Sequence, residues 1–263
     1  MNAPVRDKRL VAQSFSRAAT TYDSVASLQR AVADRLLQWL PSVSAQVVLD
    51  LGSGTGYATT QLRQRYPQAQ LVSLDLAEGM LRFARQRQPR AHHFVCGDAE
   101  ALPLADSSVD LIFSSLALQW CQQPRRLFSE LARVLKPGGR VLIATLGPAT
   151  LHELRRAWAA VDDDRHVNDF VPLRALEAAA GGLLMERQHR ELRVLEYERM
   201  GALMHALKAL GAHNVNPRRQ QGLAGSARLR ILTRAYDRQR LDNGQLPASY
   251  EVYYLDWSRE QTG

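Results

Sequence analysis

The stretch that decides the fold reads Val47-Val48-Leu49-Asp50-Leu51-Gly52-Ser53-Gly54-Thr55-Gly56. Its first five residues form an apolar run with β-branched side chains, typical of a strand buried on both faces of a parallel sheet. Three glycines follow at every second position, and the pattern over 57–65 then predicts a helix. Because glycines let a ligand approach the backbone closely, this strand-turn-helix unit predicts a nucleotide-type site. A dinucleotide fingerprint needs its third glycine at position 57, where this chain has Tyr57, so a dehydrogenase is not favoured.

Apolar runs alternate with helical patterns on both sides of this unit. Helical patterns over 8–22 and 28–39 precede it, and Pro41 ends the second. Further strands are predicted at 70–74, 93–96, 109–114 and 140–146, with helices at 76–87 and 124–135. The Lys-Pro-Gly-Gly sequence at 136–139 is expected to end the last of these helices. This alternation predicts an open parallel α/β sheet with its site at the carboxyl ends of the strands.

The C-terminal part is predicted to close the sheet and to carry a basic insertion. Helices over 149–161 and 172–180 flank a polar loop at 162–170, and long strands at 186–197 and 249–257 are expected to form an antiparallel pair. Two helices lie between these strands. The segment Glu198–Leu246 holds nine Arg or Lys against three acids, which is +6 of the chain's net +8. Such a surface favours acidic partners, of which nucleic acid is only one.

Within this insertion one helix face is predicted to be cationic. Arg230, Arg234 and Arg238 recur at four-residue spacing, which places them on one side of a helix. The insertion is expected to lie over the cofactor mouth as a lid.

Length and composition are those of an ordinary globular protein. The chain has 263 residues, of which 46% are hydrophobic and 23% charged, enough for one α/β domain with an elaboration. No apolar run reaches the length of a membrane span, and the polar N-terminus has no signal-peptide core. Cys96 and Cys121 have neither metal-ligand spacing nor a disulfide pattern. We therefore expect a cytoplasmic protein.

Three side chains after the glycine turn are predicted to contact an adenosine. Asp75, at the end of the second strand, suits hydrogen bonds to ribose hydroxyls. Met80 is placed to lie against a flat adenine ring. Asp98 follows the third strand and is predicted to accept from the adenine amine, or alternatively to cap a helix over 99–102.

The turn from Asp50 to Gly56, D-x-G-x-G-x-G, resembles motif I of class I S-adenosylmethionine (SAM) methyltransferases. The whole chain is similar to the malonyl-[acyl-carrier protein] O-methyltransferases of biotin biosynthesis. The particular matches are Phe15…Ala18-Ala19…Tyr22, Leu118-Gln119-Trp120, Gly147-Pro148-x-Thr150-Leu151-x-Glu153-Leu154, His166-Val167-Asn168 and Leu207-Lys208-x-Leu210-Gly211-Ala212-x-Asn214. The chain departs from the family pattern at Ser53, where cysteine is frequent, and at Asp169, where a basic residue is frequent. The second departure leaves open which cation anchors the substrate.

The resemblance implies a class I SAM methyltransferase fold, a Rossmann-like seven-stranded sheet with helices on both faces and a helical lid inserted near the C-terminal end. It implies a helical arm at 1–40, a SAM-binding core at 41–197, the lid at 198–246, and a final strand and tail at 247–263. The implied cofactor is SAM, with S-adenosyl-L-homocysteine as product and no metal. The implied cofactor contacts are Asp50, Gly52, Ser53, Gly54, Gly56, Asp75, Leu76, Met80, Asp98, Ala99 and Ser114. The implied catalytic residues are Tyr22, Gln119, Trp120, His166 and Lys208.

The implied reaction is methyl transfer from SAM to the free carboxylate of malonyl-acyl-carrier protein. A carboxylate is already ionised at pH 7, so this acceptor needs no general base. The expected partner is the acidic carrier protein, docked on the basic lid of a monomer that binds neither nucleic acid nor membrane. The alternative is a ubiquinone/menaquinone-type methyltransferase, which would need a base and an apolar acceptor pocket. A SAM-fold module without catalysis is a further alternative.

Overall fold

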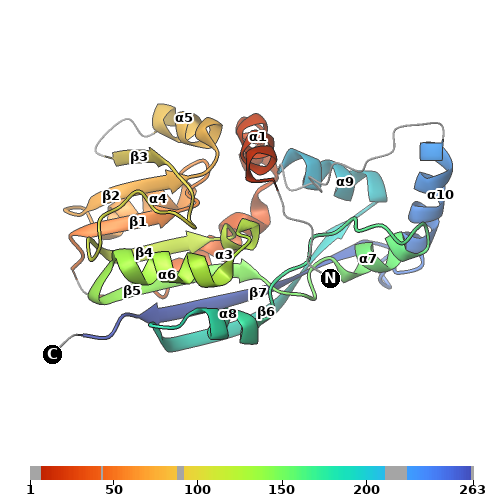
Figure 1. Cartoon of the computed structure of the whole chain (residues 1–263). Helices are drawn as coiled ribbons and strands as arrows, with labels where there is room; N and C mark the ends of the chain where they lie inside the picture. Colours follow the sequence, from red (N-terminus) through yellow and green to blue (C-terminus); the bar gives the residue numbers. More distant parts are fainter. Residues whose placement is uncertain (1–6, 43, 88–91, 211–223, 262–263) are drawn as a thin grey trace.

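The computed structural model describes residues 7–42, 44–87, 92–210 and 224–261 of the chain. One seven-stranded sheet runs through the molecule in the order β3-β2-β1-β4-β5-β7-β6 (Figure 1). Strands β1 to β5 pair in parallel, and β7 pairs antiparallel with both β5 and β6. The predicted α/β class and the closing antiparallel pair are confirmed.

The elements follow the predicted alternation closely. The strands are β1 (Val47–Leu51), β2 (Gln70–Asp75), β3 (His92–Cys96), β4 (Val109–Ser115), β5 (Leu135–Leu146), β6 (Leu184–Tyr197) and β7 (Leu246–Ser258). The helices are α1 (Lys8–Ala18), α2 (Tyr22–Val25), α3 (Ser27–Leu37), α4 (Tyr57–Arg65), α5 (Glu78–Arg87), α6 (Pro124–Val134), α7 (His152–Ala159), α8 (Leu173–Ala179), α9 (Met200–Ala209) and α10 (Ala224–Asp237), with a short 3-10 turn η1 (Leu118–Trp120). None of these helices, within the described ranges, has the length and apolarity needed to span a membrane.

Helices cover both faces of the sheet (Figure 1). On one face the apolar side chains of α3, α4 and α7 pack with every second residue of the central strands, including Phe113 and Leu142. On the other face α6 and α8 pack against the alternate residues, including Ile112 and Ile143. This alternation follows from the period of two along a strand. It explains why β1 reads as a nearly continuous apolar run, and why its one acidic residue, Asp50, is buried.

Two helices begin later than predicted, and each late start has a local cause. Helix α5 begins at Glu78 rather than position 76, because the Asp75 carboxylate accepts from the N–H of Ala77 and holds that residue in a turn. Helix α7 begins at His152 rather than position 149, because Leu151 has a φ of +53°.

Helix α6 ends at Val134, just before the 136–139 segment that was predicted to end it, but strand β5 begins at Leu135 rather than Arg140, so this segment belongs to the strand. The reason lies at the other end of the chain. The N–H of Gly138 donates to the carbonyl of Arg259 at 2.9 Å, and the N–H of Arg259 donates to the carbonyl of Gly139 at 3.0 Å. A partner distant in sequence thus extends this strand.

The N-terminal arm folds over the sheet beside α5 (Figure 1). Helix α1 approaches α5 so closely that a Cβ on Gly79 would lie 2.7 Å from the Cα of Ser16. Ser16 in turn accepts from the N–H of Gly79 through its side-chain oxygen at 3.1 Å. The arm is therefore packed onto the core at a specific point.

Helices α9 and α10 make up the described part of the basic insertion. Helix α9 contacts α2 and β6, and α10 packs on α7 through buried Leu232 and Tyr236. The predicted Gly211, Ala212 and Asn214 matches and the basic Arg218 and Arg219 lie outside the described residues. The lid over the cofactor mouth stays a prediction.

Candidate active site

The glycine turn after β1 has a backbone that only glycine adopts easily. Gly52, Gly54 and Gly56 have φ values of +72°, +55° and +85°. The N–H of Gly52 donates to the carbonyl of Leu74 at 2.7 Å, which ties the turn to the end of β2. A Cβ on Gly52 would lie 2.2 Å from the Cβ of Ala117, whereas a Cβ on Gly54 would meet nothing within 4 Å. The turn therefore lets one loop approach closely and leaves open space in front of Gly54.

Asp75 lies against this turn at the end of β2. Its Oδ2 accepts from the N–H of Gly54 at 2.9 Å, and its Oδ1 accepts from the N–H of Ala77 at 2.7 Å. Burial raises the pKa of Asp75 above its ordinary value, and these backbone donors oppose that rise. The backbone donors of Ala77, Gly54 and Leu76 use three of its four lone-pair sites, which leaves one for a ligand. The carboxylate lines a hollow where the ribose of an adenosine was expected.

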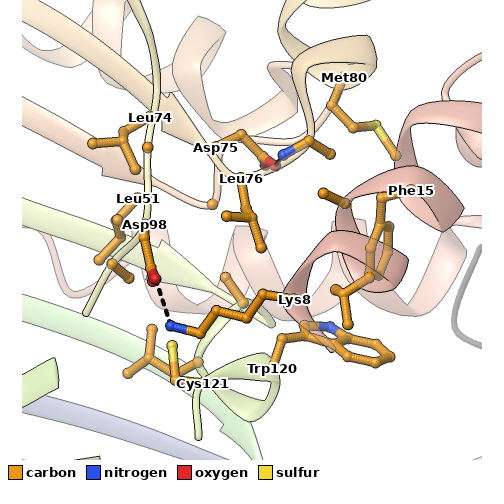
Figure 2. A pocket seen from close by; sticks show the side chains of 18 of the residues that line it. Lys8, Phe15, Leu51, Leu74, Asp75, Leu76, Met80, Asp98, Trp120 and Cys121 are labelled. Carbon is orange, nitrogen blue, oxygen red and sulfur yellow. Dashed lines mark hydrogen bonds and ion pairs between the residues drawn. The ribbon is translucent and has the colours of Figure 1, made fainter. Parts of the chain in front are cut away.

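This apolar hollow has a volume of about 800 Å³, partly open to solvent, and lies at the carboxyl ends of β1 to β4. Leu76, Met80, Phe15 and Trp120 line it, and Met80 lies beside Phe15 (Figure 2). The rings of Phe15 and Trp120 meet edge to face at 5.1 Å. The apolar walls of the hollow suit a flat heterocycle.

Lys8 of α1 reaches across the apolar hollow to Asp98 (Figure 2). Its Nζ lies 2.5 Å from Asp98 Oδ2 and also pairs with buried Glu100. Burial lowers the pKa of Lys8, but the hydrogen bonds to the two carboxylates outweigh this and leave the pKa raised. The arm is thus fastened to the wall of the hollow that was expected to meet adenine.

Asp98 does not cap a helix. Its Oδ1 accepts from the N–H of Glu100 at 3.0 Å, and residues 99–102 form a turn and an isolated bridge. That alternative is wrong because the short side chain bonds two residues ahead, which favours a turn over a helix.

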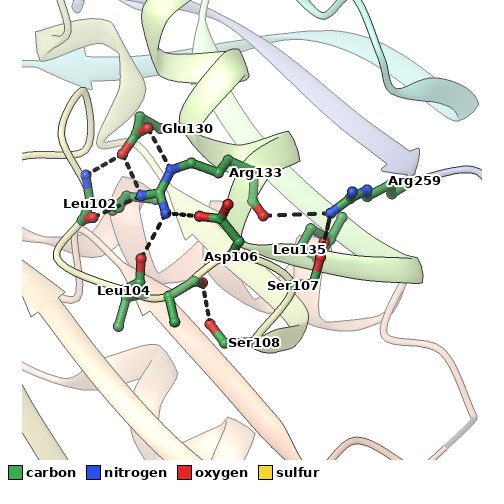
Figure 3. Close-up of polar contacts among 10 residues, drawn as sticks. Leu102, Leu104, Asp106, Ser107, Ser108, Glu130, Arg133, Leu135 and Arg259 are labelled. Atoms are coloured by element: carbon green, nitrogen blue, oxygen red, sulfur yellow. Dashed lines mark hydrogen bonds and ion pairs between the residues drawn. The ribbon is translucent and has the colours of Figure 1, made fainter.

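The loop after this turn is held in place by Arg133 of α6. Its guanidinium donates to the carbonyls of Leu102 and Leu104 at 2.9 and 2.8 Å and pairs with Asp106 and Glu130 (Figure 3). Hydrogen bonds to Glu130 raise the pKa of the guanidinium still further, so it stays charged. Arg133 of α6 therefore anchors the 102–106 loop, which directly follows the turn at Asp98.

A second, polar hollow of about 470 Å³ adjoins the first and shares Tyr22, Gly52 and Ser115 with it. Three of its side-chain oxygens are buried without a hydrogen-bond partner among the described residues: Gln29 Oε1, Ser53 Oγ and Ser115 Oγ. Buried polar atoms are nearly always paired in folded proteins. These three therefore fit a polar ligand group that is not part of the chain.

The two adjoining hollows together fit SAM. The apolar hollow offers a slot for adenine with Asp75 beside it for the ribose, and the polar hollow offers unpaired oxygens for an amino-acid end. Tyr22 stands at the junction of the two. Burial first, and then the nearby Asp75 and Asp23, raise the pKa of the Tyr22 hydroxyl, so it stays protonated and can donate a hydrogen bond there.

Asp50 forms part of the polar hollow and is only 2% exposed. Its Oδ2 accepts from the hydroxyl of Thr59. Burial raises the pKa of Asp50 to about 7, against the effect of the Thr59 hydrogen bond and with a smaller contribution from Asp75. A bound cation would favour the ionised form of this carboxyl.

An Asp50→Asn variant is expected to remove a pH dependence of stability. The folded pKa of about 7 exceeds the unfolded value of 3.8, so the native carboxyl favours folding fully below pH 3.8 and loses that contribution as pH rises to about 7. Between these values one such group changes the free energy of unfolding by at most about 1.4 kcal/mol per pH unit. Denaturant titrations of ligand-free protein from pH 4.5 to 8 should show a steeper fall for the wild type than for the variant. Parallel curves would contradict the prediction.

Several predicted site residues do not reach either hollow. Ser114 donates to the carbonyl of Leu51 at 2.7 Å inside the sheet, and the next residue, Ser115, lines both hollows instead. Gly56 begins α4 behind the turn. Gln119 donates to the carbonyl of Leu116 at 2.6 Å and accepts from Thr145, so its amide supports the loop.

The remaining two predicted catalytic residues, His166 and Lys208, also lie outside both hollows. His166 stacks on Trp158 with ring centroids 3.5 Å apart and bonds Asp162 at 2.7 Å, and Lys208 is exposed on α9. Their direct roles at the methyl group therefore stay predictions that this structure does not support. The remaining predicted residues are brought to the two hollows: Tyr22, Asp50, Gly52, Ser53, Gly54, Asp75, Leu76, Met80, Asp98, Ala99 and Trp120.

Sequence reasoning predicted Tyr22 of the arm but missed three other arm residues that line the hollows. Lys8, Gln29 and Arg30 line the hollows but come from helices whose patterns indicated only packing. Leu116, also in the wall, has a φ of +52°. A signal existed for Gln29 alone, as a polar residue beside the apolar stripe of its helix.

One cluster of possible metal ligands lies outside the hollows. Asp162, Asp164 and His166 bring single ligand atoms within 4.8 Å of one another in the described part of the chain. Asp162 already pairs with Arg228 of α10 and with His166. These contacts tie the 162–170 loop to the insertion.

Comparison with known proteins places the chain among methyltransferases. Residues 49–143 match a family model described as a methyltransferase domain. The chain is 56% identical over 252 residues to the biotin biosynthesis bifunctional protein BioHC of Cellvibrio japonicus, covering 95% of this chain and 50% of that protein. It thus spans about half the length of that relative. It is 45% identical over 262 residues to the malonyl-[acyl-carrier protein] O-methyltransferase of Laribacter hongkongensis, covering 94% of this chain and 88% of that protein.

Solved structures share the fold. A geranyl diphosphate methyltransferase in complex with SAM superposes with a TM-score of 0.53 at 15% identity, covering 88% of this chain and 85% of that one. The seven-stranded sheet with helices on both faces is therefore the class I SAM methyltransferase fold.

Proposed function

The chain belongs to the malonyl-[acyl-carrier protein] O-methyltransferase family, and from this membership we propose that it methylates the free carboxylate of malonyl-acyl-carrier protein with SAM. The observation that carries the proposal is the pair of adjoining hollows, one apolar and one polar, that meet at Tyr22, Gly52 and Ser115. The product ester would be the malonyl methyl ester that primes pimeloyl synthesis for biotin. The ubiquinone/menaquinone-type alternative is not favoured by the relatives.

The bound SAM would supply an electrophilic methyl group on a sulfonium. Asp75 would hold the ribose, Leu76 and Met80 would flank the adenine, and Asp98 would accept from the adenine amine. Lys8 already occupies Asp98 Oδ2, so the arm and the adenine amine would share this carboxylate. The chain's contribution is alignment of donor and acceptor and exclusion of water, rather than proton transfer.

The acceptor needs no base because it arrives ionised. Tyr22, whose raised pKa keeps it protonated, would donate a hydrogen bond at the junction of the hollows. Phe15 of the arm and Trp120 of η1 would shield that junction from water, since the Phe15 ring lies 6.5 Å from the Tyr22 ring and meets Trp120 edge to face. The apolar surroundings would leave a carboxylate poorly hydrated and more nucleophilic.

Incubation with labelled SAM and malonyl-acyl-carrier protein, with malonyl-CoA and the unmodified carrier in parallel, tests the proposal. Label should enter a base-labile ester on the malonyl carrier and not on the unmodified carrier. Single-turnover rates at saturating SAM should stay level between about pH 6 and 8, because no group must lose a proton. A tenfold fall per unit below pH 7 would indicate a general base and return the phenol or carbon acceptor to consideration.

We further propose that the acidic carrier docks on α10. Arg230 and Arg234 are exposed on this helix and have no ion pair within the described residues, while Leu232 and Tyr236 hold its other face on α7. Basic side chains held on a packed helix would steer an acidic protein towards the site.

Reversing both Arg230 and Arg234 to Glu is expected to raise the KM for malonyl-acyl-carrier protein about tenfold or more, chiefly through slower encounter. SAM affinity and malonyl-CoA turnover should change far less, since that substrate lacks the acidic protein surface. The matched control reverses Arg125 and Arg174, exposed on α6 and α8 over the opposite face of the sheet. Equal slowing of both acceptors, or equal effects of the two pairs, would show that α10 is not the docking surface.

A further inference from the structure

The residues that line the polar hollow include several with buried side-chain oxygens. Gln29 Oε1, Ser53 Oγ and Ser115 Oγ are buried there without partners among the described residues, and Asp50, whose carboxyl is buried, lines the same hollow. Buried acceptors left without a donor are costly. A primary ammonium carries three N–H donors and a positive charge, so it suits a hollow lined by these oxygens.

One cation faces the same hollow. Arg30, next to Gln29 on α3, is the only basic side chain among the described lining residues. Its Nη1 donates to the carbonyl of Asp23 at 2.7 Å, which fixes the guanidinium and leaves other N–H donors unused by that bond. A guanidinium is the side chain best suited to bind a carboxylate through two parallel hydrogen bonds.

The glycine turn itself has few donors left for a carboxylate. The N–H groups of Gly52 and Ser53 donate to the carbonyl of Leu74 at 2.7 and 3.1 Å, and that of Gly54 donates to Asp75 at 2.9 Å. The N–H of Gly56 donates to the carbonyl of Ser53 at 3.0 Å. These four donors are used within the protein, and Arg30 is the one charged donor among the described residues that line the polar hollow.

We propose that helix α3 recognises the amino-acid end of SAM, with Gln29 accepting a hydrogen bond from the α-ammonium and Arg30 binding the α-carboxylate. This rests on the proposed function for the identity of the cofactor. It assigns the two binding contacts to the N-terminal arm, so the arm and the Rossmann-like core hold the cofactor jointly. An adenosine derivative without the amino acid leaves these groups unpaired and binds weakly.

The test compares S-adenosyl-L-homocysteine with analogues lacking only the α-amino group or only the α-carboxyl group. Dissociation constants are measured by calorimetry on the full chain. Gln29→Met should weaken S-adenosyl-L-homocysteine about tenfold and change binding of the deamino analogue less than twofold. Arg30→Met should weaken S-adenosyl-L-homocysteine about tenfold and change binding of the decarboxylated analogue less than twofold. The control is Gln38→Met, the same change at an exposed position just after α3.

Each variant should be insensitive only to the analogue that lacks its own partner group. This result separates ligand recognition from loss of structure, because a general packing defect weakens the binding of every ligand alike. Equal weakening of S-adenosyl-L-homocysteine and the deamino analogue in Gln29→Met, or no weakening at all, overturns the role of Gln29. The Gln29→Glu variant keeps an acceptor and should retain the preference for the amino group, and loss of that preference would also count against the proposal. Binding of S-adenosyl-L-homocysteine without methyl transfer to the malonyl carrier would overturn the proposed acceptor only. Failure of the wild type to bind S-adenosyl-L-homocysteine would overturn both.

Discussion

A Gly54→Val variant is expected to bind SAM at least tenfold more weakly than the wild type. A side chain at this position projects into space in which a Cβ meets no protein atom within 4 Å, and that space borders the polar hollow. Valine would place two methyl groups where the amino-acid end of the cofactor is proposed to lie. Its φ of +55° adds backbone strain of about 1–2 kcal/mol.

Gly182→Val provides the matched control. Gly182 has a φ of +88°, and a Cβ at this position would also meet no atom within 4 Å, but the residue follows α8 and lies outside both hollows. Both variants should therefore lose stability in thermal melts, and only Gly54→Val should lose SAM affinity in calorimetry. Unchanged SAM affinity in Gly54→Val would refute the placement of the cofactor.

Asp75→Ala is expected to weaken SAM binding tenfold or more. It removes the proposed ribose acceptor, and hydrogen bonds to charged groups contribute about 1.5–3 kcal/mol each. It also removes the acceptor of the Gly54 and Ala77 N–H groups, so the glycine turn should lose stability as well. Asp75→Asn, which keeps one acceptor oxygen, should lie between the wild type and Asp75→Ala in calorimetric titrations.

The Asp110→Ala variant separates loss of a cofactor contact from loss of backbone stability. Asp110 accepts from the N–H groups of Gln46 and Val47 at 3.0 and 2.8 Å, much as Asp75 does at the other end of β1, but it lines neither hollow. Its loss should lower the melting temperature and leave the SAM dissociation constant unchanged. If Asp110→Ala weakened SAM as strongly as Asp75→Ala, the effect of Asp75 would be structural rather than a cofactor contact.

The parts of the site that were predictable from the sequence are those set by short-range geometry. Gly52 and Gly54 require positive φ values that few other residues tolerate, so their spacing signals the turn directly. Asp75 follows an apolar strand whose length fixes where it ends, and parallel strands bring their carboxyl ends to one edge. Spacing did not predict where the side chains of Ser114 and Gln119 point. Successive side chains along a strand point to opposite faces, so Ser114 and Ser115 differ in direction. The Gln119 amide instead donates to the carbonyl of Leu116 in its own loop.

Local pattern also misjudged where elements begin and end. Strand β5 extends back to Leu135 because Leu135 pairs with Val109 and because Gly138 and Gly139 bond Arg259, which lies more than a hundred positions away. Asp98 lies in the wall of the apolar hollow, but its partner Lys8 comes from α1, 90 positions earlier in the chain. No window of local sequence contains such pairs.

The sequence by itself determined the order of strands and helices, the glycine turn, the acidic residue after β2 and the family, because each depends on residue types at fixed short spacings. Only the tertiary structure decided that α1 and α3 complete the two hollows with Lys8, Gln29 and Arg30, and that Ser115 rather than Ser114 faces them. It also placed His166 beside Trp158 and away from both hollows. The physical reason is that which side chains converge depends on how helices pack on the sheet, and that packing is set by burial summed over the whole core.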